Sequence, residues 1–524
     1  MHKYLYNLFK KIPSDLFLLF ISLIILALSI RGLPGIPTSQ DLNNPKWKEN
    51  GPFELSPERG RFALMYSLVE DHSFQFSNEV GQFASPDVVV SRGKYASMFA
   101  PLVSFITIPG YIIGKFFGAS QVGAFAIISL FAIFNFFLIR AMAIRLGATH
   151  TASTLGAIAF LFATPAFSYA VNLYQHNIST FLILLSLYAL IRFKNFWSLV
   201  LVFLLCAASI PLDYPNLIFM FPIGLFAVGR IITLKKLREK VVTTIRLPYL
   251  LTLSIMILPI LFFLWFNQMS FGNPFQLSGT LPSAANTFSN TINNSQDLAS
   301  KSRLSEESKE PENKKTALGF FQTRRILNGF YIHFISPDRG IIYFTPVILL
   351  GILGAILAYR KKIKFVSLFV AIIGANILLY SMWGDPWGGW AFGSRYLIPG
   401  YAILSIFIGL LLTYWRKYIL FLIVFLILFS YSAAVNTLGA ITTSAMPPQV
   451  EVLNLEKLSG IVQKYTYERN WDFLVAGNSK SFIYQTVVKN YLTATQYYEI
   501  LAGLIIFAGL SLTTFLYISG RNNK

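Results

Sequence analysis

The sequence is poor in charged residues and nearly lacks cysteine. Only 13% of its 524 residues are charged, whereas charged side chains make up about a quarter of a soluble domain. That deficit excludes a water-soluble globular protein. The single cysteine, Cys206, excludes an intrachain disulfide. The sequence also lacks a P-loop, so nothing in it supports nucleotide hydrolysis.

The sequence is instead rich in long apolar runs. Hydrophobic residues make up 55% of the chain, 49 of them Phe, and the mean hydropathy is +0.57. An apolar run of about 18 to 25 residues crosses the hydrocarbon core of a bilayer as a helix. We therefore predict an all-α polytopic membrane protein with about twelve transmembrane helices. Their predicted positions are near residues 14–32, 119–141, 150–168, 177–193, 196–211, 214–231, 248–266, 341–358, 364–382, 395–414, 418–438 and 496–517.

The basic residues predict how these helices are oriented. The chain has 43 Lys and Arg against 23 Asp and Glu, and most basic residues stand in short clusters beside apolar runs. Such clusters stay on the cytoplasmic side and meet anionic lipid headgroups. We therefore expect membrane lipids as partners, not nucleic acid, and both chain termini in the cytoplasm. The clusters are Lys3/Lys10/Lys11, Arg140/Arg145, Arg192/Lys194, Lys235/Lys236/Arg238/Lys240, Arg360/Lys361/Lys362/Lys364, Arg416/Lys417 and Arg521/Lys524.

One further apolar stretch, residues 98–117, does not fit this alternation. A crossing there would place Arg140 and Arg145 outside and reverse every later helix. The stretch also contains Pro101 and Pro109, which disfavour a regular helix interior. We predict an interfacial or re-entrant helix here, and the alternative is a thirteenth span.

The predicted topology leaves three sizeable segments on the outer face, at residues 33–97, 267–340 and 439–495. Residues 283–316 of the second segment are rich in Ser, Asn, Lys and Glu, a composition typical of a mobile loop. Functional residues should be sought in these segments and at the outer ends of the spans.

Residues 387–397 form a polar, aromatic and Gly-rich turn between two apolar runs. The turn carries one arginine, Arg395, and Pro399 follows it. A guanidinium at a membrane surface needs water or a partner, and its planar fork suits a phosphate. This pattern predicts an anion-binding site, and the anion would most simply belong to a lipid.

The first outer segment contains a predicted helix that begins at Ser56 and Pro57. Phe62, Met65 and Leu68 would share one face of it, so we expect a helix lying along the membrane surface. Glu58 stands in its first turn, where the helix N-terminus would keep the carboxylate ionised. Glu58 is thus a candidate proton acceptor, and the alternative is that it only stabilises the first turn.

Four short patterns follow one another along the chain: Glu58, Arg61, Phe62, Ala63 and Leu64; Lys94, Tyr95, Pro101 and Leu102; Tyr174, Gln175, His176 and Asn177; and Arg395, Tyr396, Leu397, Ile398 and Pro399. In this order they resemble the GT-C superfamily, membrane glycosyltransferases that use polyprenyl-phosphate-linked sugars. The superfamily includes the protein O-mannosyltransferases and the lipid A aminoarabinose transferase. The resemblance runs through most of the chain, and it implies that residues 1–438 form a transmembrane catalytic domain. Residues 439–524 would then add an external segment and a last transmembrane helix.

The resemblance, together with the position of polar residues at the outer face, indicates roles for particular residues. Glu58 is the first candidate for the catalytic base and Asp87 the second, with a simple Pro-Asp turn as the alternative for Asp87. Arg395, Tyr396 and Lys94 would bind the donor phosphate. The residues that would position the substrates are His176, Asn177, Asp213 and Trp390. Asp338 and Arg339 are a further pair that could orient the sugar or acceptor, with a surface ion pair as the alternative.

The chain departs from the family pattern at two positions. Pro57 and Glu58 stand where members have an adjacent acidic pair, and His176 stands where a later acidic residue is usual. These departures weaken the case for an acidic metal site. No cofactor is predicted with certainty, a divalent metal is left open, and His176 is a candidate ligand or hydrogen-bonding residue.

The implied reaction is an inverting displacement at the outer face of the cytoplasmic membrane. A carboxylate would deprotonate an acceptor hydroxyl on a glycan, lipid or protein, and the lipid phosphate would leave. One alternative is a lipid-linked glycan flippase or another transporter. Transporters usually carry repeats and charged residues at the bilayer midplane, whereas the ionisable residues here stand at span ends. A second alternative is a glycan polymerase or ligase, in which residues 439–495 would carry the chemistry.

Overall fold

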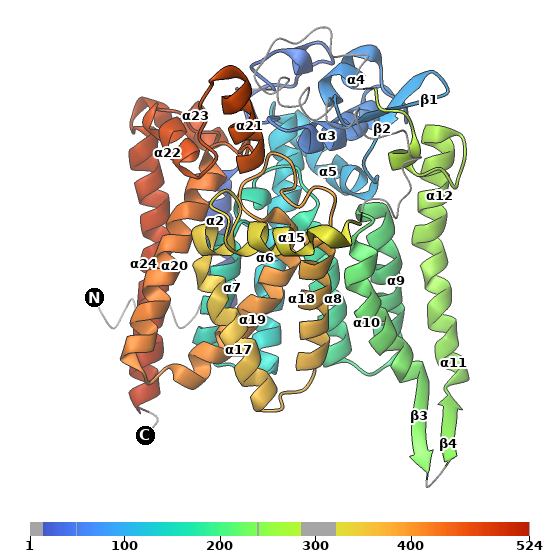
Figure 1. The fold of residues 1–524 in the computed structure, drawn as a ribbon, viewed down its shortest axis with the longest axis vertical. Helices are drawn as coiled ribbons and strands as arrows, with labels where there is room; N and C mark the ends of the chain where they lie inside the picture. The colour runs from blue at the N-terminus through green and yellow to red at the C-terminus, as the bar shows by residue number, and fades with distance from the viewer. Residues whose placement is uncertain (1–13, 49, 238–239, 285–320, 523–524) are drawn as a thin grey trace.

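The computed structural model describes residues 14–48, 50–237, 240–284 and 321–522. A bundle of helices forms its lower part, and a layer of short helices with a β-hairpin covers the upper end of the bundle (Figure 1). Most of the predicted mobile loop 283–316 lies outside the described residues, as do Lys3, Lys10, Lys11, Arg238 and Lys524.

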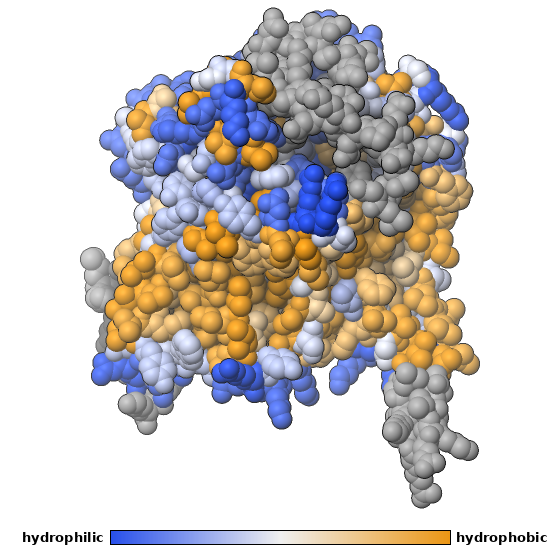
Figure 2. Space-filling model, viewed as in Figure 1, coloured by the Kyte–Doolittle hydropathy of each residue, from blue (hydrophilic) through white to orange (hydrophobic). Residues whose placement is uncertain are grey.

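The bundle has the composition of a membrane domain. Among the described residues, five helices are long and apolar enough to cross a membrane, and eight shorter apolar helices accompany them. All five, and seven of the eight, each overlap one predicted span, while the number of crossings stays a prediction. On the face drawn in Figure 2, an apolar band crosses the bundle, with polar residues above and below it. The bundle helices are α2 (Ser14–Ser29), α6 (Ser120–Arg145), α7 (His150–Phe162), α8 (His176–Arg192), α9 (Phe196–Leu212), α10 (Asn216–Ile231), α12 (Ile257–Phe271), α17 (Leu349–Arg360), α18 (Val366–Ser381), α19 (Ile398–Trp415), α20 (Ile419–Ile441) and α24 (Ala494–Asn522).

The upper layer, which we call the cap, is built from segments far apart in the sequence (Figure 1). At the opposite end of the molecule, the antiparallel hairpin of β3 (Ile232–Leu237) and β4 (Lys240–Ile245) extends away from the bundle. Short α15 (Ile326–Phe334) lies across the upper end of the bundle. The cap consists of α3 (Ser56–Val69), α4 (Asn78–Ala84), the antiparallel strands β1 (Val88–Ser91) and β2 (Lys94–Ser97), α5 (Leu102–Phe116), α21 (Gln449–Ser459), α22 (Glu468–Val475) and α23 (Phe482–Thr486).

The apolar stretch 98–117 forms α5, which runs alongside α3. Ser104 Oγ donates a hydrogen bond to the carbonyl of Arg61 at 2.9 Å, and Lys115 Nζ pairs with the Glu70 carboxylate at 2.8 Å. Figure 1 shows α5 beside α3 in the upper part of the molecule. Its 15 residues exceed the 13 of α7 and the 12 of α17, so helix length does not distinguish α5 from the helices of the bundle. Whether α5 lies at the membrane interface or crosses the bilayer stays a prediction.

Helix α19 lies at the centre of the bundle and packs against α6, α7, α8, α17 and α18. Nearly all of its residues are buried. Small residues allow this packing, because a side chain at Gly354 would overlap the Phe407 carbonyl and one at Gly156 would overlap the Ser405 carbonyl. The turn that carries Arg395 leads directly into α19, so a rigid helix fixes one side of the site described next.

Candidate active site

Glu58 lies in the first turn of α3, which begins as predicted at Ser56 and Pro57. Its side chain is fully buried, and neither carboxylate oxygen has a hydrogen-bond partner among the described residues. Burial raises the pKa of Glu58 to about 8, although the nearby Arg31 guanidinium opposes that change. The prediction that the helix N-terminus keeps this carboxylate ionised is therefore wrong, whereas the placement of α3 along the membrane surface stays a prediction. The cap and the bundle bury α3 on most of its circumference.

Arg61 stands one turn after Glu58, on the same side of α3. Its Nη1 donates to the carbonyl of Pro57 at 2.8 Å, and its guanidinium carbon lies 4.4 Å from the centre of the Phe99 ring. Its Nε is buried without a partner in the described part of the chain. Burial lowers the pKa of Arg61 to about 10, so the guanidinium keeps its charge at neutral pH.

Arg395 approaches the same place from the turn before α19. Its Nη2 donates to the carbonyl of Gly388 at 2.7 Å, while Nε and Nη1 are buried with no partner among residues that the structure describes. Gly388 has a φ of +72°, a conformation that glycine adopts without strain. Position 388 therefore lets the turn fold back toward the arginine.

Tyr174 lies between the two arginines. Its ring centre is 5.8 Å from the guanidinium carbon of Arg61 and 5.1 Å from that of Arg395. The ring of His176 stacks on the Tyr174 ring with 5.9 Å between ring centres. The ring centre of Tyr396 lies 6.3 Å from that of His176. Two guanidinium groups thus converge on one buried aromatic group, an arrangement that would be repulsive without an anion nearby.

Asp213, at the end of α9, completes the site. Gln175 Nε2 donates to its Oδ2 at 3.1 Å, and the half-buried carboxylate acts electrostatically on Arg61. Burial raises the pKa of Asp213, and the charge of Arg61 opposes that change. The structure therefore brings together Glu58, Arg61, Tyr174, His176, Asp213, Arg395 and Tyr396 from four separate segments.

Other predicted residues have different surroundings. Asp87 is half-buried and accepts a hydrogen bond of 2.5 Å from Ser56 Oγ at the start of α3. The amide of Asn177 donates to the carbonyls of Ala166 and Tyr169, which is a structural role. Asp87 thus stands beside the site, whereas Asn177 supports the chain that enters α8.

Lys94 and Trp390 lie apart from the two arginines. Lys94 is exposed on β2 and lines an open cavity of about 420 Å³ with Asp71, Asn78 and Tyr95. Trp390 Nε1 donates to a carboxylate oxygen of Glu451 in α21 at 2.8 Å. No described contact joins either side chain to Arg395, so the predicted phosphate role of Lys94 has no geometric support.

Arg339 holds the turn that carries Arg395. Its guanidinium donates to the carbonyls of Trp387 at 3.1 Å, Gly389 at 2.9 Å and Met446 at 2.8 Å. Both Arg339 and Asp338 are buried, so the alternative of a surface ion pair is wrong. In the sequence, only the Asp-Arg-Gly run at residues 338–340, beside an apolar run, indicated that Arg339 contributes to the site. Arg61 was part of a recognised pattern, but the sequence did not indicate its place in the site.

The described residues contain no group of three or more His, Cys, Asp or Glu side chains arranged to hold a metal ion. His176 keeps one ring nitrogen, Nε2, buried and without a partner within the described ranges. That nitrogen is suited to a hydrogen bond with a substrate.

The helical arrangement of the chain is similar to that of two solved structures of ArnT from Cupriavidus metallidurans. The structure in the apo state is 13% identical with a TM-score of 0.45, and the one bound to undecaprenyl phosphate is 11% identical with a TM-score of 0.41. Each similarity covers 96% of this chain and 77% of the other. No protein-family model matches the chain, and no curated protein matches it in sequence.

Proposed function

We propose that the protein is a membrane glycosyltransferase that moves a monosaccharide from a polyprenyl-phosphate-linked donor to an acceptor hydroxyl. The supporting observation is one buried site that holds a carboxylate and a guanidinium with unpaired polar atoms. Within the described chain, both carboxylate oxygens of Glu58 and two of the three guanidinium nitrogens of Arg395, Nε and Nη1, have no partner. Buried polar groups are almost always hydrogen-bonded. Unpaired acceptor and donor atoms at one site therefore point to a ligand that supplies their partners.

The two arginines indicate the charge of that ligand. Arg395 presents two unpaired nitrogens, Nε and Nη1, and Arg61 presents one, Nε, in a place where burial strengthens their attraction for an anion. The site lies at the end of an apolar bundle, where an amphiphilic donor could place its chain along the helices and its phosphate at the arginines. A polyprenyl phosphodiester carries both parts.

The carboxylate supplies the second half of the reaction. Ionised Glu58 takes the proton of the acceptor hydroxyl as that oxygen forms a bond to the anomeric carbon of the sugar. The bond from that carbon to the phosphate oxygen breaks, and its electron pair leaves with the lipid phosphate. Arg395 and Arg61 stabilise the charge that develops there. The raised pKa of Glu58 suits a base that works near neutral pH.

Attack from the face opposite the phosphate inverts the anomeric centre. The side chains of His176, Asp213 and Tyr396 belong to the same site and would hold the sugar. Asp87, hydrogen-bonded to Ser56, is the second candidate for the base. A glycan, a lipid or a protein can each supply the acceptor hydroxyl, and we place the reaction on the outer face of the cytoplasmic membrane.

The experiment is donor turnover by the purified full-length protein in liposomes. A panel of polyprenyl-phosphate-linked hexoses and pentoses serves as donors, and a fraction of envelope glycans and lipids serves as acceptor. We expect one donor to be converted to free polyprenyl phosphate with sugar incorporated into the acceptor. Glu58→Gln should lower that rate by about 10² to 10⁴, the usual contribution of a general base, while binding of undecaprenyl phosphate persists.

Glu70→Gln is the matched control, because Glu70 directly follows the same helix but pairs with Lys115. It should keep the wild-type rate. Loss of turnover in Asp87→Asn with full turnover in Glu58→Gln would assign the base to Asp87. Movement of lipid-linked sugar across the bilayer without transfer would instead identify a flippase.

A further inference from the structure

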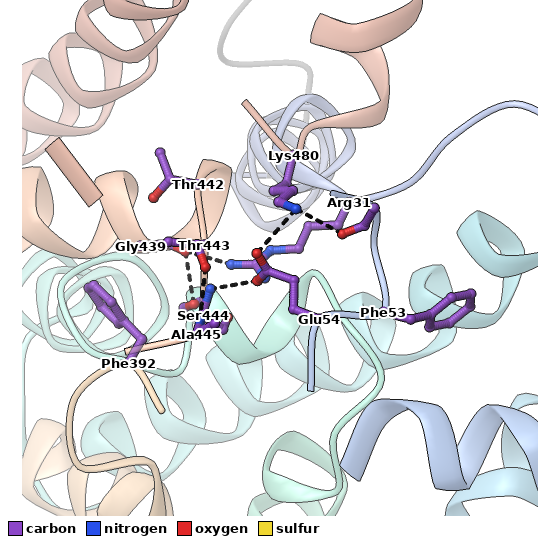
Figure 3. Close-up of polar contacts among 12 residues, drawn as sticks. Arg31, Phe53, Glu54, Phe392, Gly439, Thr442, Thr443, Ser444, Ala445 and Lys480 are labelled. Carbon is purple, nitrogen blue, oxygen red and sulfur yellow. Dashed lines mark hydrogen bonds and ion pairs between the residues drawn. The ribbon is translucent and has the colours of Figure 1, made fainter. Parts of the chain in front are cut away.

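A second charged cluster lies close to Glu58, and we refer to it as the Glu54 cluster. It contains Arg31, Glu54 and Lys480 (Figure 3). Arg31 Nη1 lies 3.3 Å from Glu54 Oε2, and Lys480 Nζ lies 3.1 Å from Glu54 Oε1. The backbone N–H of Ser444 donates to Oε2 at 2.8 Å. All three charged side chains are at least nine-tenths buried.

The remaining donors of the cluster also have partners. Arg31 donates through Nε and Nη2 to the carbonyls of Ala440 and Gly439, and Lys480 Nζ donates to the carbonyl of Gly51 at 3.0 Å. Arg59, which adjoins Glu58 in the sequence, donates to the carbonyls of Glu54 and Ser85. Each cation around Glu58 is thus held by groups other than the Glu58 carboxylate.

We propose that Glu54 is a positioning residue for Glu58. By pairing with Arg31 and Lys480, it keeps both cations from pairing with the Glu58 carboxylate, which stays available to accept a proton. This inference rests on the proposed function. Glu54 stands four residues before Glu58. Arg31 and Lys480 pair with Glu54 and also act electrostatically on the Glu58 carboxylate, which has no hydrogen-bond partner in the described chain.

The electrostatics around Glu58 agree with this geometry. The charged groups that act on it are Arg31, Glu54, Arg59 and Lys480, and the neutral phenol of Tyr174 is also nearby. On the neighbouring elements, Asp87 accepts from Ser56 and Lys115 pairs with Glu70. Burial raises the pKa of Glu58 and the negative charge of Glu54 adds to that effect, whereas Arg31 and Lys480 lower it.

Two substitutions should therefore shift the protonation of Glu58 in opposite directions. Glu54→Gln removes the negative charge and frees both cations to stabilise ionised Glu58, so the acid limb of the pH–rate profile should move to lower pH. Lys480→Gln removes a cation, so the limb should move to higher pH. We expect a shift of about one pH unit in each variant, a tenfold change in the ionised fraction on the acid side.

The test measures donor turnover from pH 5 to 10, using the donor identified for the wild type. Glu70→Gln, which breaks an ion pair at the C-terminal end of α3, should leave the acid limb in place. The infrared carbonyl band of protonated Glu58, assigned by its loss in Glu58→Gln, gives the same titration without turnover. Opposite shifts support the proposal. If the acid limb of the pH–rate profile and the titration of the infrared band keep their wild-type positions in both folded variants, the proposal is wrong.

The two readouts separate the possible failures. If Glu58→Gln retains full turnover, the proposed function is wrong, yet the infrared titration still decides whether Glu54 controls Glu58. Should Glu54→Gln fail to fold, the direction of the shift in Lys480→Gln decides alone. A uniform loss of rate with no shift of the limb would show that Glu54 has only a structural role.

Discussion

The Glu54 cluster and the candidate active site are both buried and charged, but they differ in how their polar atoms are satisfied. In the Glu54 cluster, Arg31, Glu54 and Lys480 all have ionic and hydrogen-bonding partners. In the candidate site, Glu58 and Arg395 leave polar atoms unpaired within the described chain. Charge is expensive to bury without compensation. The first arrangement therefore stabilises the fold, whereas the second is suited to a ligand.

The largest expected difference between the Glu54 cluster and the candidate active site is the loss of stability when the carboxylate is removed from each. Glu54→Leu leaves Arg31 and Lys480 buried without a counter-charge, so we expect the free energy of unfolding to fall by about 3 to 5 kcal/mol. Glu58→Leu breaks no pair and should lower it by less than about 1 kcal/mol. Thermal unfolding in detergent micelles at pH 7 measures both. Similar losses in the two variants would contradict the distinction.

Glu58 and Glu54 should also make the free energy of unfolding depend on pH in opposite directions. The pKa of Glu58 is raised from 4.5 to about 8, so between these values the native state binds more protons than the unfolded state. Its contribution to stability is present below pH 4.5 and is lost as pH rises, by about 2 kcal/mol between pH 6 and 8.

Glu54 behaves in the other direction. Burial alone would raise its pKa, but Lys480 and Arg31 hold it below 4.5, so its contribution is present above pH 4.5 and is lost only in acid. Unfolding scans at pH 6 and pH 8 test the difference. Glu58→Gln should be less sensitive to pH than the wild type over this range, and an unchanged sensitivity would count against the buried, protonated state of Glu58.

Because two guanidinium nitrogens of Arg395 have no partner in the described chain, we expect a substitution of this residue to lower activity with little loss of stability. Arg395→Lys keeps the charge but loses the planar fork, so sugar transfer should fall at least about tenfold, roughly 1.4 kcal/mol of transition-state stabilisation. Arg325→Lys is the control, since Arg325 donates to the carbonyl of Gly384 and lies outside the site. Near-normal transfer by Arg395→Lys would show that Arg395 is only an anchor at the membrane interface and does not bind the donor phosphate through its planar fork.

The smallest expected difference concerns two neighbouring tyrosines. The hydroxyl of Tyr169 accepts a hydrogen bond from the backbone N–H of Phe392 at 2.9 Å, whereas the hydroxyl of Tyr174 is buried without a partner in the described chain. Tyr169→Phe should lower the free energy of unfolding by about 1 kcal/mol. Tyr174→Phe should leave it unchanged or slightly higher, which the same thermal scans can resolve.

The sequence predicted the elements of the fold well because apolar length is a local property. Each predicted span matches an apolar helix among the described residues, and the helix at Ser56 begins where Pro57 indicated. The burial of Glu58 could not be predicted in this way. It depends on contacts between the first segment and residues near 440 and 480, such as the pairing of Glu54 with Lys480.

The candidate site shows the same limit. Local patterns identified Glu58, His176, Asp213, Arg395 and Tyr396, which the structure brings together. They also suggested Lys94 and Trp390, whose surroundings differ because neighbouring segments of the cap direct them elsewhere. A short pattern indicates the chemistry that a residue can perform, but which side chains meet depends on packing between distant segments.

The burial of α19 has a consequence for how the protein is made. A helix with so little surface facing lipid is best stabilised by protein neighbours. The helices that enclose it, α6, α7, α8, α17 and α18, all precede it in the chain, so they are synthesised first. Helix α19 can therefore leave the translocon into a site that is already assembled, and α20 and α24 follow. The turn with Arg395 would take its place at this step, late in biogenesis.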